Sequence, residues 1–133
     1  MMTFGGFLMV KGVREQLPLL RSPSREEVAS ALQLAVNVGA GALVMKKTPA
    51  PEIGACELSL LWEAGHYLLT LNVLEEDGDV SVRTPSWQDA SPGGAEIFGH
   101  VYTGARALSS IEFVGKVFDE FLVTGDVSLE LLS

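Results

Sequence analysis

The residues able to support nucleophilic or metal chemistry are few and scattered. The chain has one cysteine, Cys56, and two histidines, His66 and His100, in separate apolar segments. A zinc site needs clustered cysteine and histidine ligands, and a reactive thiol needs a neighbouring base that lowers its pKa. Cys56 lies between Ala55 and Glu57 at the start of an apolar stretch, so we expect it to be a small buried core residue. We therefore predict no catalytic residue, no metal ion and no cofactor.

Glycine and carboxylate patterns do not match known site motifs either. Gly39-Ala40-Gly41 follows a predicted helix instead of opening one, so it cannot form a phosphate cradle at a helix N-terminus. Glu75, Glu76, Asp77 and Asp79 crowd a single predicted turn. Acid–base catalysis needs carboxylates in differing environments, and the ligand spacing of a calcium loop is missing. The acidic turn is therefore interpreted as a surface feature.

The charge of the chain is negative and unevenly distributed. The 133 residues have a formal net charge of −8, which argues against a general nucleic-acid binder. Residues 1–48 hold six basic and three acidic residues, a local +3, whereas residues 49–133 hold three basic and fourteen acidic residues, a local −11. An acidic half is either a solvated face or a docking surface for a basic partner, and charge alone leaves both open.

Trp87 is the second surface candidate. It lies in a predicted irregular loop over residues 84–94 that contains two prolines and two adjacent glycines. A tryptophan there either folds back over the edge of the sheet or anchors a partner. The predicted partner-binding residues are Glu75, Glu76, Asp77, Asp79 and Trp87.

The elements that must position these residues follow from hydrophobic periodicity. Ser24 and Glu27 have capping-box spacing and predict a helix over about residues 25–38; Ser109 and Glu112 predict a second helix that ends at Thr124-Gly125. The first helix has a predicted apolar stripe of Val28, Ala31, Leu32, Ala35 and Val36. Strands are predicted over residues 4–10, 42–47, 57–63, 66–74, 80–83 and 96–102, with hairpin turns at Ala64-Gly65 and Asp77-Gly78.

These elements predict one α+β domain over residues 1–133: an antiparallel meander sheet of five or six strands with two helices packed on one face. Trp62 and Tyr67 would pair across the first hairpin, and Phe113, Phe118 and Phe121 would belong to the core. The apolar start of the chain has no charged leader region, and no window is long enough to span a membrane. We expect no membrane contact and, with one cysteine, a location in the reducing cytoplasm.

The segment from Phe113 to Ser128 is the most recognisable part of the sequence. It reads Phe-Val-Gly-Lys-Val-Phe-Asp-Glu-Phe-Leu-Val-Thr-Gly-Asp-Val-Ser and ends an amphipathic helix in Phe-Leu-x-Thr-Gly. With the meander before it, it resembles the immunity proteins of bacterial polymorphic toxin systems, in particular the family paired with nucleic-acid deaminase toxins, and a related uncharacterised bacterial domain family. The resemblance covers about the last 80 residues. Leu129-Glu130-Leu131-Leu132 stands where that pattern usually has a closing tryptophan.

The resemblance implies a non-enzymatic α+β domain that binds and blocks a secreted toxin domain inside the producing cell. Its acidic turn and Trp87 would then form the contact patch. The alternative is a small accessory or homo-oligomeric domain with a small-ligand or structural role, for which a homodimer would bury Trp87. An enzyme built from Cys56 with His66 or His100 is the third hypothesis.

Overall fold

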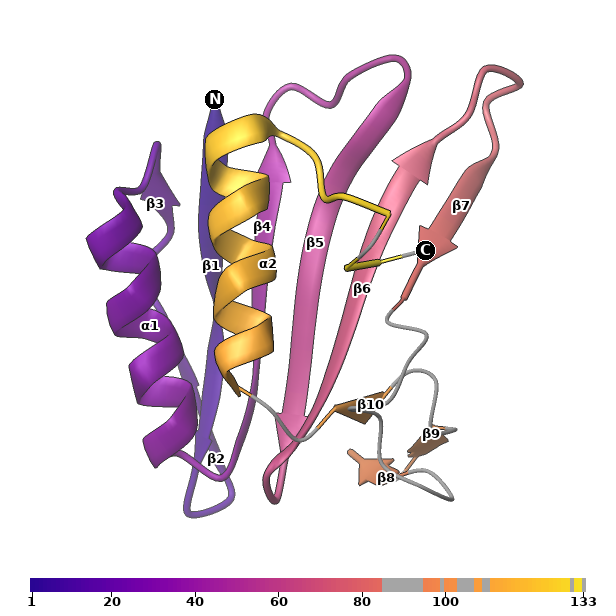
Figure 1. The fold of residues 1–133 in the computed structure, drawn as a ribbon. Helices are drawn as coiled ribbons and strands as arrows, with labels where there is room; N and C mark the ends of the chain where they lie inside the picture. Colours follow the sequence, from indigo (N-terminus) through magenta and orange to yellow (C-terminus); the bar gives the residue numbers. More distant parts are fainter. Residues whose placement is uncertain (85–94, 99, 103–106, 109–110, 130, 133) are drawn as a thin grey trace.

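The structure, a computed structural model, describes residues 1–84, 95–98, 100–102, 107–108, 111–129 and 131–132. Within these ranges the chain forms an antiparallel sheet of eight strands with two helices, α1 (Arg25–Asn37) and α2 (Ile111–Thr124), on one face (Figure 1). The long central strands lie in the order β6 (His66–Leu74), β5 (Gly54–Glu63), β4 (Ala40–Lys47) and β1 (Met2–Val10). Short strands extend both edges: β7 (Val80–Arg83) and β10 (Ala107–Leu108) pair with β6, and β2 (Val13–Gln16) and β3 (Leu20–Arg21) pair with β1.

The predicted α+β class, with an antiparallel sheet and two helices on one face, is confirmed. The hairpin between β5 and β6 has the predicted turn at Ala64-Gly65, where both residues have positive φ (52° and 81°). Two such residues match the twist of the flanking strands. Trp62 pairs with Tyr67 across this hairpin, as predicted, and both side chains are buried.

Two parts of the sheet differ from the prediction. Strands β2 and β3 lie between residues 10 and 25, where no strand is predicted. The pattern of β2 does not reveal a strand, because all of its residues are exposed and show no apolar alternation. The single strand predicted over residues 96–102 is wrong: the chain forms a separate hairpin of β8 (Ala95–Ile97) and β9 (His100–Tyr102), in which Ile97 pairs with His100. Phe98 turns the chain with a φ of 51°, which an apolar pattern does not reveal.

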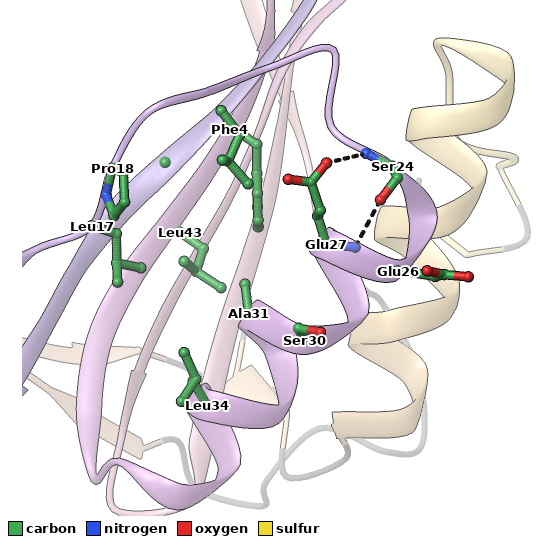
Figure 2. A pocket seen from close by; sticks show the side chains of 12 residues that line it. Phe4, Leu17, Pro18, Ser24, Glu26, Glu27, Ser30, Ala31, Leu34 and Leu43 are labelled. Carbon is green, nitrogen blue, oxygen red and sulfur yellow. Dashed lines mark hydrogen bonds between the residues drawn. The ribbon is translucent and has the colours of Figure 1, made fainter.

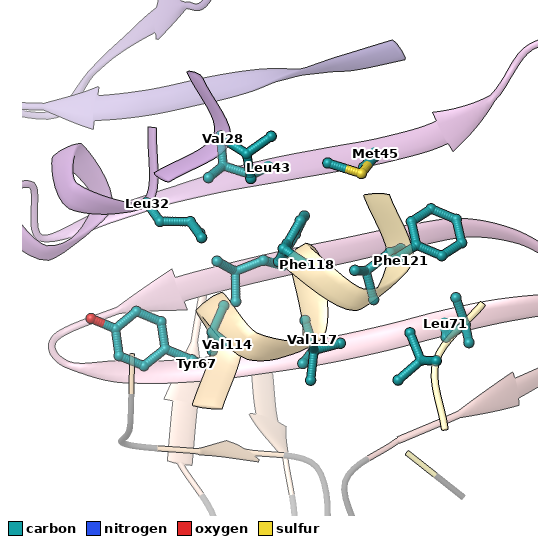
Figure 3. Packing of buried hydrophobic residues seen from close by; sticks show 14 of the residues in the cluster. Val28, Leu32, Leu43, Met45, Tyr67, Leu71, Val114, Val117, Phe118 and Phe121 are labelled. Atoms are coloured by element: carbon teal, nitrogen blue, oxygen red, sulfur yellow. The ribbon is translucent and has the colours of Figure 1, made fainter. Parts of the chain in front are cut away.

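The core lies between the helices and the sheet (Figure 3). Alternate residues of the central strands point to the helices, and Phe118 packs edge-on against Phe4 with ring centroids 6.0 Å apart. The core positions predicted for Phe113, Phe118 and Phe121 are confirmed. Val36, in contrast, was placed on the buried stripe of the first helix, but it is 45% exposed. That prediction was wrong because α1 buries a narrower stripe, consisting of Val28, Leu32 and Ala35.

The start of α1 and the end of α2 follow the predicted local chemistry. Ser24 Oγ accepts a hydrogen bond from the Glu27 backbone N–H at 3.0 Å, and Glu27 Oε1 accepts one from the Ser24 N–H at 2.9 Å. This reciprocal pair is the predicted capping box. At the other helix, Gly125 has a φ of 77° and donates to the Phe121 carbonyl at 2.8 Å, which ends α2 as predicted. The predicted start of α2 at Ser109 lies outside the described residues.

Trp62 is fixed by a close approach to the start of β4. It is 1% exposed, and its Nε1 donates to the Val38 carbonyl at 2.8 Å. The indole ring lies over Gly41, where an added Cβ would stand 2.6 Å from the ring and from the Phe7 carbonyl oxygen. A glycine is therefore required at this position.

No helix in the described part of the chain is long and apolar enough to cross a membrane.

Candidate functional site

The acidic turn, residues 75–79, forms the tip of the hairpin between β6 and β7. The Glu75 N–H donates to the Asp79 carbonyl at 2.9 Å, and the Gly78 N–H donates to the Glu75 carbonyl at 3.1 Å. Gly78 has a φ of 88°, a conformation that side chains disfavour. Two carboxylates strengthen the turn: Asp77 Oδ1 accepts from the Asp79 N–H at 3.0 Å, and Glu75 Oε1 accepts from Ser81 Oγ at 2.6 Å. The tip is therefore held in one conformation by its own polar groups.

The other two carboxylates of the acidic turn are available to a partner. Within the described ranges, no hydrogen bond or ion pair engages the carboxylate of Glu76 or of Asp79. Both side chains are exposed. Sequence reasoning identified all four acidic residues as one group. The structure divides them into two that hold the turn and two that point into solvent unpaired.

Apolar side chains flank the acidic turn on strand β7. Val80 and Val82 are each 55% exposed and alternate along the strand with Ser81 and Arg83. Figure 1 shows β7 at an edge of the sheet, remote from β1 and α1. The turn and this strand together offer negative charge beside apolar surface. Trp87, the remaining predicted contact residue, lies outside the described residues.

Arg83 connects strand β7 to the C-terminal segment. Its Nε and Nη2 donate to the Leu132 carbonyl at 3.0 and 2.7 Å, and Nη2 also donates to the Val127 carbonyl. Its Nη1 lies 3.3 Å from Asp126 Oδ1. Val127 and Leu132 are buried against the sheet. The Thr-Gly-Asp-Val-Ser stretch that was prominent in the sequence therefore closes the core beneath the acidic hairpin.

Cys56 is less buried than predicted. It lies at a bulge in β5, between the pairs Ala55–Val73 and Glu57–Asn72, and is half-buried. Its Sγ donates to the Asn72 carbonyl at 3.3 Å. Burial, and then the charge of Glu57, raises the pKa of the Cys56 thiol. A protonated thiol is a poor nucleophile.

The structure does not bring Cys56 and His66 together. Cys56 bonds to Asn72, whereas His66 lies six residues earlier on β6, a separation of about 20 Å along a strand. The side chain of His100 lies outside the described residues. Among the described residues, no group of three or more His, Cys, Asp or Glu side chains is arranged to hold a metal ion.

An apolar groove that the sequence did not indicate lies beside α1 (Figure 2). It has a volume of about 440 Å³ and lies between α1, β1 and the segment that contains Leu17 and Leu20. Its floor includes Phe4 and Leu43, and its helical wall includes Leu34. Leu34 falls off the buried stripe of α1 and is 46% exposed. An apolar residue outside the buried stripe of its helix was therefore the sequence signal that could have indicated the groove.

Comparison with known proteins places the chain in a family. The chain is similar to a solved structure, "Crystal structure of a hypothetical protein from Neisseria gonorrhoeae", with 30% sequence identity and a TM-score of 0.82. The similarity covers 96% of this chain and 90% of that chain. A comparison with curated proteins found no match. The model of a family of unknown function, DUF6911, matches residues 1–131, and the chain belongs to this family.

Proposed function

We propose that this chain is a non-catalytic protein-binding domain whose acidic turn docks on a basic surface of a partner. The observation that carries the proposal is that only two of the four carboxylates in the turn are engaged in hydrogen bonds. Glu75 and Asp77 hold its conformation, while Glu76 and Asp79 keep unpaired, exposed carboxylates. A turn whose backbone is ordered before binding loses little backbone freedom when a partner arrives.

The surroundings of the turn favour a macromolecular partner. Opposite charges on two proteins steer their encounter and fix their orientation. The exposed Val80 and Val82 beside the turn supply apolar area that a partner would cover. Charge and apolar surface side by side support recognition of a folded protein.

The partner that we propose is a secreted bacterial toxin domain, blocked in the cytoplasm of the producing cell. This step rests on the resemblance of the segment from Phe113 to Ser128 to toxin-immunity proteins. A toxin that acts on nucleic acid needs a basic surface to hold phosphates. An acidic turn that covers this surface would exclude the substrate without any chemistry of its own.

The test begins with a search for a toxin gene beside this one and continues with rescue of cells that express its toxin domain; the absence of such a neighbour would count against the proposal. The wild-type chain should restore growth, and the double variant Glu76→Lys with Asp79→Lys should not. Glu15→Lys is the matched control, because Glu15 is exposed on β2 at the opposite edge of the sheet and should not affect rescue. Full rescue by the double variant, or no rescue by the wild-type chain, would overturn the proposal.

Stability measurements separate lost binding from lost folding. Neither substituted carboxylate in the double variant makes a hydrogen bond in the described structure, so its melting temperature should stay within about 2 °C of wild type. Sedimentation of the chain alone addresses the accessory-domain alternative. A stable homodimer that persists without a toxin, together with failed rescue, would favour that alternative.

A further inference from the structure

The apolar groove lies between α1 and β1 (Figure 2). Arg25 Nε and Nη2 donate to the two carboxylate oxygens of Asp119 at 2.7 and 2.8 Å, which ties the start of α1 to α2. On its other side, α1 faces β1 with the short side chains of Ser30 and Ala31. Short side chains leave the space unfilled. The segment that contains Leu17 and Pro18 borders the groove on the side opposite α1 (Figure 2).

The lining of the groove is mainly apolar, with buried Phe4 and Leu43 at its floor and exposed Leu34 at its rim. Phe4, Leu43, Leu17 and Leu20 line it on the sheet side, and Ala31 and Leu34 line it on the helix side. Leu34 remains 46% exposed there. Covering such surface with an apolar group is favourable. The volume of about 440 Å³ lies within the range of small-molecule sites.

The charge at the groove selects among apolar ligands. The residues that line it include two acidic side chains, Glu26 and Glu27, but neither lysine nor arginine. Figure 2 shows Glu26 pointing away from the groove, while the Glu27 carboxylate lies at its upper end. One Glu27 oxygen accepts the capping hydrogen bond from Ser24, and the other points away from Ser24. A cationic head group would meet an acceptor there, whereas a carboxylate would be repelled.

We propose that the apolar groove binds a small amine with an apolar tail. The tail fills the space between α1 and β1, and the ammonium group lies against the Glu27 carboxylate. This site is separate from the acidic turn, which lies at the β7 edge of the sheet.

The test compares three probes of equal chain length by NMR titration of backbone amides: octylamine, octanol and octanoate, each below the concentration at which it forms micelles. Octylamine should bind about 2- to 5-fold more tightly than octanol, as for a partly exposed ion pair, and octanoate should bind most weakly. The shifted amides should include Leu17, Ala31 and Leu34. Equal binding of the three probes, preference for octanoate, or shifts confined to the acidic turn would overturn the proposal.

Variants test the tail and the charge separately. Ala31→Trp fills the groove and should weaken octylamine binding at least about 10-fold. Val36→Trp places the same side chain at an exposed position of α1 that does not line the groove, and it should leave binding unchanged. Glu27→Gln keeps an oxygen for the capping bond and should reduce octylamine binding to the octanol level.

Three results would contradict the assignment. Unchanged octylamine binding by Ala31→Trp would place the ligand elsewhere, and unchanged octylamine preference in Glu27→Gln would remove the role of the charge. A wild-type dimer that Ala31→Trp dissociates would make a second copy of the chain the occupant. If Ala31→Trp does not fold, the amide shifts of the wild-type chain and the Glu27→Gln titration still decide the question.

Discussion

Replacing Arg83 by methionine should loosen the C-terminal segment from the sheet. Methionine keeps an apolar stem of similar length but removes the guanidinium. The carbonyl groups of Val127 and Leu132 then lose their charged donor. Both residues are buried, at 2% and 0% exposure, so water reaches their surroundings poorly.

The expected fall in the free energy of unfolding follows from the two carbonyl groups that lose their charged donor. A hydrogen bond to a charged group contributes about 1.5–3 kcal/mol. The ion pair with Asp126 adds little, because that carboxylate is 66% exposed. Water can partly replace the guanidinium, whose side chain is 16% exposed. We therefore expect the free energy of unfolding to fall by about 3 kcal/mol and the melting temperature to fall by about 10 °C.

Urea unfolding measures the loss, and amide hydrogen exchange locates it. Arg83→Met should accelerate exchange of the Val127 amide relative to wild type. The amides of the β5–β6 hairpin should be accelerated less. Asp126→Asn is the matched control: it removes the charge but keeps an oxygen that can accept from the Val127 N–H, now at 2.8 Å, so it should cost at most about 0.5 kcal/mol. A loss below about 1 kcal/mol for Arg83→Met would refute the reasoning.

Three further predictions concern stability. The raised pKa of Cys56 means that its contribution to stability is full below the unfolded-state thiol pKa of about 8.5 and is lost as the pH rises through the folded-state pKa; urea unfolding should show this decline in wild type and less of it in Cys56→Ala. Gly41→Ala forces a methyl group against the Phe7 carbonyl and the Trp62 ring and should cost at least about 2 kcal/mol, whereas Gly39→Ala, which meets nothing within 4 Å, should change urea stability little. Ser24→Ala removes the capping bond and should lower the free energy of unfolding by about 1 kcal/mol; thermal unfolding that matches wild type would contradict this.

Local chemistry made much of the fold predictable. The capping box at Ser24 and the turn at Ala64-Gly65 depend on a few adjacent residues, and both formed as expected. The edge strand β2 escaped prediction because it has no buried face and so no apolar alternation. The β8–β9 hairpin was missed because a non-glycine residue, Phe98, takes the positive φ.

The candidate sites needed the structure because they depend on contacts between distant residues. Sequence alone placed four carboxylates in one turn, but the hydrogen bond from Ser81 to Glu75 is what distinguishes engaged groups from free ones. Likewise, the apolar groove is lined by residues from separate parts of the chain, such as Phe4, Leu34 and Leu43. The half-burial of Cys56 follows from a bulge in the β5–β6 pairing.

The most direct test of the central claim is the affinity of the purified chain for the purified neighbouring toxin domain, measured by calorimetry at two salt concentrations. The account predicts binding that weakens as salt rises and that weakens at least about 10-fold when Glu76 and Asp79 are both replaced by lysine, with Glu15→Lys unchanged. Wild-type affinity in that double variant, or the absence of binding by the wild-type chain, would contradict a partner-docking role for the acidic turn.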